Sequence, residues 1–292
     1  MTNDTKHEGI GIEFISVLGL PPVPFIELAA EMGCGYIGMA LEPMFAENPH
    51  GYPAWSLRNV AALRQETIAA LRDCGVSISL GEGFLAWPHT DVAHYTADLD
   101  LMRELGAERI NLMSVDPDLS RTFDQCARFA ELATARGLIA TIEYLPGLAI
   151  GDLATAVAAV RHADNPNFRV LVDAMHFFRS GSKPAELAAL DPALIGYVQL
   201  CDVPWVSKYE DYSYEARFDR LTPGQGELPL LDLLAAVPSD VVVGLEIPML
   251  REATAGIGPK ERLSGGLRAT RELRAQAMAL KASGSTKGQL GK

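Results

Sequence analysis

The chain has 292 residues, of which 48% are hydrophobic and 21% charged, and its formal net charge is −12. This composition predicts a folded globular protein, and the negative charge argues against a nucleic-acid backbone or an anionic membrane surface as partner. No apolar stretch reaches the roughly 18 residues of a membrane-spanning helix. The N-terminus, MTNDTKHEG, lacks a secretory pattern, and the four cysteines are widely separated. We therefore expect a cytoplasmic protein with reduced thiols.

Short apolar runs alternate with helical patterns along the whole chain. In order, the runs lie at 11–18, 36–41, 76–83, 109–115, 139–145, 169–176, 195–203 and 241–248. Each run is followed by apolar residues at helical spacing. Almost wholly apolar runs are typical of strands that are buried on both faces of a parallel sheet. Eight such units, with no glycine-rich phosphate loop after the first, predict an α/β fold: a closed (β/α)₈ TIM barrel.

The same pattern sets the predicted domain limits. Residues 1–281 are expected to form a single barrel domain, and several of its helices end in a glycine that suits a left-handed cap. The final segment, ASGSTKGQLGK at 282–292, consists mostly of small and polar residues without a pattern. Such a composition predicts a disordered tail.

An aspartate ends one of the most apolar runs, RVLVDAMHFFRSG at 169–181. Asp173 follows Val170, Leu171 and Val172, and His176 comes three residues later. Burying an unpaired carboxylate is costly, so this acid is expected either to cap the next helix or to lie beneath a positive charge.

Neighbouring runs also carry oxygen-bearing side chains near their carboxyl ends, where barrel enzymes have their active sites. These residues are Glu143 in TIEYL, Gln199 in YVQLCD and Glu246 in GLEIP. Together with Asp173 they would place three carboxylates and one amide at one rim. Because the carboxylates repel one another, and because hard cations prefer oxygen ligands, the pattern predicts one divalent cation, Mn²⁺ or Mg²⁺.

This set, with Asp173-x-x-His176 and RLTPGQGELPL, resembles the xylose isomerase-like barrels over roughly residues 10–275. That group includes sugar isomerases and epimerases, inosose dehydratase and 3-dehydroshikimate dehydratase, and it is distantly similar to endonuclease IV. The resemblance implies that Glu143, Asp173, Gln199 and Glu246 are the metal ligands. It also implies that Arg220 contacts substrate, with Arg217 as the neighbouring candidate.

One ligand departs from the pattern of the sugar epimerases. Their strand-7 ligand is usually a histidine, whereas this chain has Gln199, as 3-dehydroshikimate dehydratase-like members do. Glu82, near the end of the third run, and His89 beyond it are further candidates for lining a substrate pocket, and Trp87 could form an apolar wall. Glu82 is equally compatible with a turn, and His89 with an exposed loop.

The expected substrate is a small polyhydroxylated carbonyl compound. In an isomerase or epimerase, our first reading, Glu143 and Glu246 would act as the acid/base pair on an enediolate. In a dehydratase, the second reading, one base would remove the α-proton while His176 protonates the leaving hydroxyl. A phosphodiesterase of the endonuclease IV type is remote, because its metal cluster is rich in histidine. No nucleic-acid or membrane partner is expected, and a homo-oligomer stays open.

Overall fold

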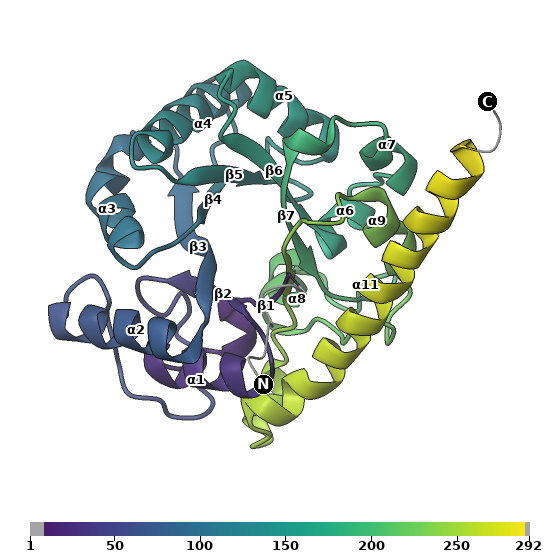
Figure 1. Cartoon of the computed structure of the whole chain (residues 1–292). Coiled ribbons are helices and arrows are strands. Elements are labelled where there is room, and N and C mark those ends of the chain that lie inside the picture. The colour runs from purple at the N-terminus through teal and green to yellow at the C-terminus, as the bar shows by residue number, and fades with distance from the viewer. Residues whose placement is uncertain (1–8, 290–292) are drawn as a thin grey trace.

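The structure is a computed structural model that describes residues 9–289, and its centre is a closed barrel of eight parallel strands in sequence order (Figure 1). This confirms the predicted TIM barrel. The strands are β1 (Ile10–Ile12), β2 (Tyr36–Ala40), β3 (Ser77–Ala86), β4 (Arg109–Ser114), β5 (Ile139–Glu143), β6 (Phe168–Asp173), β7 (Ile195–Leu200) and β8 (Val243–Leu245).

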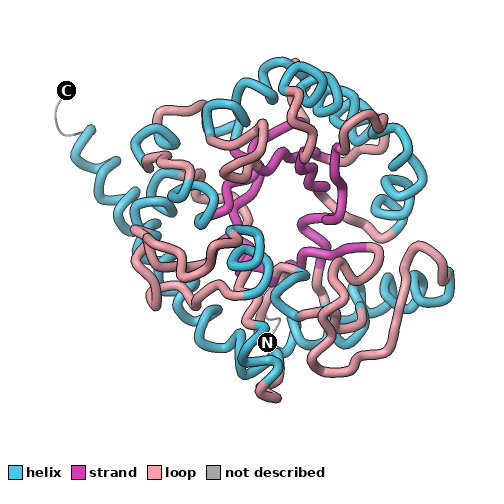
Figure 2. The backbone as a smooth tube through the Cα atoms, turned by 180° about the vertical axis from the view of Figure 1, so that it is seen from behind, coloured by secondary structure: helices cyan, strands magenta, loops and turns pink. Residues whose placement is uncertain are grey.

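Helices form a ring around these strands, and the loops join the two layers (Figure 2). The α-helices are α1 (Pro22–Glu31), α2 (Ala61–Cys74), α3 (Thr96–Glu104), α4 (Leu119–Thr134), α5 (Leu153–Ala163), α6 (Ala174–Arg179), α7 (Pro184–Ala188), α8 (Tyr212–Phe218), α9 (Leu230–Ala236), α10 (Leu250–Thr254) and α11 (Pro259–Gln289). Three short 3-10 helices are η2 (Phe14–Val17), η3 (Val92–Tyr95) and η4 (Pro192–Leu194).

The first predicted strand is too long, because the apolar run 11–18 contains two elements. β1 ends at Ile12, and Phe14–Val17 form η2, whose four residues are all buried. A buried 3-10 turn and a buried strand have the same apolar composition, so the sequence pattern alone does not separate them. The third strand departs in the opposite direction, since β3 continues to Ala86 instead of ending near 83.

A small apolar cluster lies directly beneath the predicted site inside the barrel. Leu80, Leu171 and Tyr197 are fully buried and pack together with Val242. Side chains two residues apart on a strand share a face, so the next residues upward on that face are Glu82, Asp173 and Gln199. Inside the barrel, an apolar layer of side chains therefore lies below a polar layer that is nearer the carboxyl ends of the strands.

The barrel closes by pairing its first strand with its last. Ile10, Gly11 and Ile12 of β1 lie beside Val243, Gly244 and Leu245 of β8. Ser16 strengthens this seam, because its hydroxyl donates to the carbonyl of Leu245 and accepts from the amide of Ile247.

The long helix α11 packs on the outside of this seam and runs to Gln289. Arg274 of α11 donates to the carbonyls of Gly9 and Val241. It therefore ties together the segments that lead into β1 and β8, the first and last strands of the barrel. The helix also covers most of the segment 282–292 that was expected to be a disordered tail. Extending the helix already formed by the preceding residues requires no new nucleation step. Residues 290–292 and the polar stretch 1–8 lie outside the described residues.

Among residues 9–289, no helix is both long enough and apolar enough to cross a membrane.

Candidate active site

A cavity of about 380 Å³ opens at the carboxyl ends of the strands. Its polar lining includes Glu143, His176, Gln199, Arg220 and Glu246, all five of which the sequence singles out. The rest of the lining is mostly apolar and comes from the loops and strands around the rim, including Met44, Phe45, Phe84, Met113, Val115 and Leu145. The cavity therefore combines a set of ionisable groups with an apolar wall.

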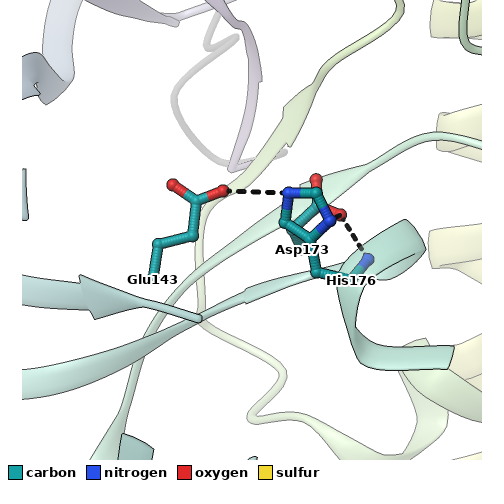
Figure 3. A group of neighbouring side chains, drawn as sticks. All are labelled: Glu143, Asp173 and His176. Carbon is teal, nitrogen blue, oxygen red and sulfur yellow. Dashed lines mark hydrogen bonds and ion pairs between the residues drawn. The ribbon is translucent and has the colours of Figure 1, made fainter. Parts of the chain in front are cut away.

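Three of the predicted residues meet at the ends of β5 and β6 (Figure 3). Glu143 is the last residue of β5, Asp173 is the last residue of β6, and His176 lies in the first turn of α6. The ring atom Nε2 of His176 is 3.5 Å from Oε1 of Glu143. The backbone amide of His176 donates to Oδ1 of Asp173 at 2.8 Å, so the aspartate caps α6.

Asp173 also lies beneath a positive charge. The sequence predicted either a helix cap or such a charge, and the structure shows both. The Oδ2 atom of Asp173 is 2.5 Å from Nη1 of Arg220, and the same nitrogen is 2.6 Å from Oε2 of Glu246. Arg220 therefore bridges two of the predicted metal ligands. Asp173 is fully buried and is not among the residues that line the cavity, because the arginine lies between them.

Gln199 and Glu246 lie on the neighbouring strands β7 and β8. The amide nitrogen of Gln199 donates to Oε1 of Glu246 at 2.9 Å. The amide oxygen of Gln199 is buried and has no hydrogen-bond partner among the described residues. The four predicted ligands are thus linked through Arg220 and His176 into one cluster.

Burial and neighbouring charges set the ionisation of this cluster. Burial and the negative charge of Asp173 raise the pKa of Glu143 to about 8. Burial opposes ionisation of Asp173, but the positive charge of Arg220 outweighs it and lowers the pKa of that carboxyl to about 2. Burial lowers the pKa of His176 to about 4. At neutral pH the metal-free site therefore has an ionised Asp173, a neutral imidazole and a mostly protonated Glu143.

The donor atoms present fit a divalent cation. One ligand atom from each of Glu143, Asp173 and His176 lies within 4.8 Å of the others. The orphaned amide oxygen of Gln199 is a further acceptor without a donor. Carboxylate and amide oxygens match the preferences of Mg²⁺ and Mn²⁺.

The remaining predicted residues separate into two groups. Glu82, at the inner face of β3, and Arg217, on α8, both line the cavity. Trp87 and His89 are exposed in the loop after β3 and do not line it. Because β3 extends to Ala86, these two residues are carried past the cavity mouth.

Three contacts in the site involve residues that the sequence did not single out. Asn111 on β4 donates to Oε2 of Glu143 at 2.6 Å, and Tyr212 on α8 lies 2.7 Å from Nδ1 of His176. Tyr197 on β7 donates to Oε1 of the fully buried Glu13 at 2.7 Å. A polar residue inside the apolar run RINLMSV could have identified Asn111. The aromatic and charged stretch 208–220 is long for a connection between a strand and a helix, which predicts a functional loop, and Tyr212 lies in it.

Comparison with known proteins identifies the family of this chain. Residues 26–273 match the family model described as xylose isomerase-like TIM barrel, and the chain belongs to that family.

Individual relatives are more distant. A 3-dehydroshikimate dehydratase of Pseudomonas aeruginosa is 32% identical over 144 residues, which cover 47% of this chain and 22% of that protein. The chain thus spans about a fifth of the length of that curated relative, which is an enzyme. A fusion protein of a xylose isomerase-like TIM barrel and 4-hydroxyphenylpyruvate dioxygenase superposes with a TM-score of 0.76 at 22% identity, over 95% of this chain and 44% of the other. The IOLI protein, whose structure contains a zinc atom, has a TM-score of 0.74 at 15% identity, over 92% and 98% of the two chains.

Proposed function

We propose that the protein is a divalent-metal-dependent dehydratase that removes water from a cyclic β-hydroxy ketone of the 3-dehydroshikimate type. The observation that carries this proposal is the mixed lining of the cavity, with acid/base groups on one side and an apolar wall on the other. The sequence placed an isomerase or epimerase first. The apolar wall, Gln199 and the similarity to a 3-dehydroshikimate dehydratase support the reverse order.

The apolar wall bears on substrate class because hydroxyl groups need partners when they are buried. A buried hydroxyl without a hydrogen bond costs about 1–3 kcal/mol, so a sugar chain with a hydroxyl on each carbon suits a lining that is polar throughout. Side chains such as Phe45, Phe84 and Met113 offer no hydrogen bonds. They suit the apolar face of a six-membered ring that becomes aromatic when water is lost.

Arg217 supports a substrate that carries a carboxylate. Its guanidinium lies over the rings of Phe45 and Phe218, at 5.7 and 5.4 Å from the ring centroids, and its Nε donates to the carbonyl of Ser213. No acidic side chain within the described part of the chain pairs with it. The charge of Arg220, by contrast, is already neutralised by Asp173 and Glu246. Arg217 is therefore the cation available to an anionic substrate group.

A bound divalent cation would polarise the substrate carbonyl and so acidify the adjacent C–H. Glu143 is the base in this proposal, because it lines the cavity and its carboxylate would be ionised once a cation is bound. Burial raises the pKa of Tyr212, so its hydroxyl stays protonated, and in this proposal that hydroxyl donates to Nδ1 of His176. The neutral imidazole then carries its proton on Nε2, which is the atom that faces Glu143.

This arrangement supplies a balanced proton path for elimination. Glu143 takes the α-proton, His176 gives the Nε2 proton to the departing β-hydroxyl, and the proton on Glu143 then restores the imidazole. The α-proton and the hydroxyl leave together as one water, and a double bond forms between their two carbons.

An isomerase or epimerase is the second candidate, and one observation favours it. Glu143 and Glu246 both line the cavity but come from β5 and β8, which are not neighbours in the barrel. Two carboxylates on different sides of a bound substrate could remove a proton from one face and return it to the other.

Product analysis in deuterium oxide tests the proposal. The protein is loaded with Mn²⁺ and incubated with 3-dehydroshikimate, inososes and ketoses. We expect a product that is lighter than its substrate by one water and that absorbs as an aromatic ring. A product of unchanged mass that carries deuterium would instead identify an isomerase or epimerase. His176→Asn should slow elimination about 10²–10⁴-fold, whereas His162→Asn, on the exposed face of α5, should not change it.

A further inference from the structure

A second group of carboxylates lies on the other side of the barrel interior from Glu143. Glu13 follows β1, Glu82 belongs to β3 and Glu246 follows β8, and one oxygen from each lies within 4.8 Å of the others. All three side chains are more than nine-tenths buried. This cluster meets the first one only through Glu246, and the proposed reaction does not use Glu13 or Glu82.

Three oxygens in this region have no hydrogen-bond partner among the described residues. They are Oε2 of Glu13, Oε1 of Glu82 and Oε1 of Gln199, which have exposed fractions of 0%, 7% and 2%. The other oxygen of Glu13 accepts from Tyr197, so the carboxylate is held with its free oxygen unsatisfied. Buried acceptors without donors are rare in folded proteins, and three together indicate a missing positive partner.

The backbone is shaped around these oxygens. A methyl group at Gly38 of β2 would overlap both Oε2 of Glu13 and Oε1 of Glu82, so the two acceptors converge on one point beside this glycine. A methyl group at Gly244 of β8 would overlap the other carboxylate oxygen of Glu13. Any larger residue at either position would push Glu13 out of the cluster.

We propose that Glu13, Glu82 and Glu246 bind a second divalent cation, with the amide oxygen of Gln199 as a further ligand. The site would share Glu246 and the amide oxygen of Gln199 with the first cation and would lie beside it. This inference rests on the proposed function only for the existence of that first cation.

Charge balance supports a second cation over a single one. The interior holds five carboxylates, namely Glu13, Glu82, Glu143, Asp173 and Glu246, and one guanidinium, that of Arg220. Four negative charges remain when all five acids are ionised, as carboxylates must be when they bind metal. One divalent cation leaves half of them uncompensated in a buried site, whereas two neutralise the set.

A shared proton is the simplest alternative occupant, and the donor count argues against it. One proton between Glu13 and Glu82 would satisfy two oxygens and leave the amide oxygen of Gln199 unpaired. A metal ion takes several oxygen ligands at once, including neutral amide oxygens.

Metal stoichiometry and electron paramagnetic resonance test the proposal without any substrate. Protein stripped with a chelator is titrated with Mn²⁺, and bound metal per chain is measured after removal of free ions. We expect two equivalents in the wild type. Two-metal sites place their ions about 3.5–4 Å apart, so the bound Mn²⁺ should show magnetic coupling in place of an isolated-ion spectrum.

Variants separate the two sites. Glu13→Gln should bind one equivalent with an uncoupled spectrum, and Gly38→Ala should do the same by displacing Glu13 and Glu82. Glu215→Gln, another buried acid that pairs with Arg179 away from the cavity, should keep two equivalents.

The opposite results are equally clear. Two equivalents in Glu13→Gln, or one equivalent in the wild type that Glu13→Gln leaves in place, would overturn the second site. Failure of the proposed function looks different, because Glu143→Gln would then leave bound Mn²⁺ unchanged.

Discussion

Replacing Arg220 with leucine tests how the buried charges are held in the absence of metal. The guanidinium bridges Asp173 and Glu246, and all three side chains are at least 95% buried. Leucine removes the charge and leaves both carboxylates without their cation. Removing one partner of a buried ion pair typically costs about 3–5 kcal/mol, so we expect a loss of this size in the free energy of unfolding.

Part of this loss depends on pH in a way that can be worked out. Burial opposes ionisation of Asp173, yet Arg220 outweighs it, and the folded-state pKa of about 2 lies below the ordinary value of 3.8. A lowered pKa stabilises the folded state at every pH above the unfolded value. This contribution is about 2 kcal/mol at neutral pH, and it disappears as the pH falls from about 4 through 2. Arg220→Leu should therefore lose most of its disadvantage at the acid end.

Urea unfolding in the presence of a chelator, followed from pH 7 down to pH 2, measures both effects. The chelator matters because a bound cation would compensate the exposed carboxylates. Arg217→Leu is the matched control, since this arginine is exposed and forms no ion pair within residues 9–283. It should cost less than about 1 kcal/mol. Equal losses in the two variants, or a loss in Arg220→Leu that does not depend on pH, would refute the reasoning.

Three further predictions concern the cavity. Burial, and then the charge of Asp173, raise the pKa of Glu143 to about 8, so the free energy of unfolding of the metal-free protein should fall as the pH rises from about 4.5 to 8. Urea unfolding of Glu143→Gln should not show this part of the pH dependence. Tyr212→Phe removes the donor to Nδ1 of His176, so turnover should fall while KM changes little, and steady-state kinetics should show the split. Gln199→His replaces an amide with a stronger ligand for first-row metals, so titration should show tighter binding and a shift toward Zn²⁺; unchanged affinity would place residue 199 outside the coordination shell.

The sequence predicted most of the fold because eight buried strands leave a strong apolar signal. It also predicted that Glu143, Gln199 and Glu246 reach one cavity, since parallel strands in a barrel end at the same rim. The role of Arg220 could not be predicted in this way. Its partners, Asp173 and Glu246, are 47 and 26 residues away, and only the folded chain shows that it neutralises them.

Side-chain direction explains the other differences. Trp87 and His89 follow a polar strand end in the sequence, but β3 runs three residues beyond its predicted end and carries them outward. Glu13 lies within the first apolar run, 11–18, and its position there suits a side chain that points into the barrel. It is in fact the residue at which β1 gives way to η2, and its side chain turns into the barrel over Gly244. Local sequence does not specify which strand neighbour is a glycine, so this packing is visible only in three dimensions.

The seam between β1 and β8 orders events during synthesis on the ribosome. Ile12 pairs with Leu245, which lies 233 residues later in the sequence, so the barrel closes only after that residue has been synthesised. Contacts so distant in sequence form late in folding, because a long chain must first be drawn together. Glu246, which belongs to both proposed metal positions, arrives with that last strand. A nascent chain therefore has an incomplete set of proposed ligands until β8 has emerged and paired with β1.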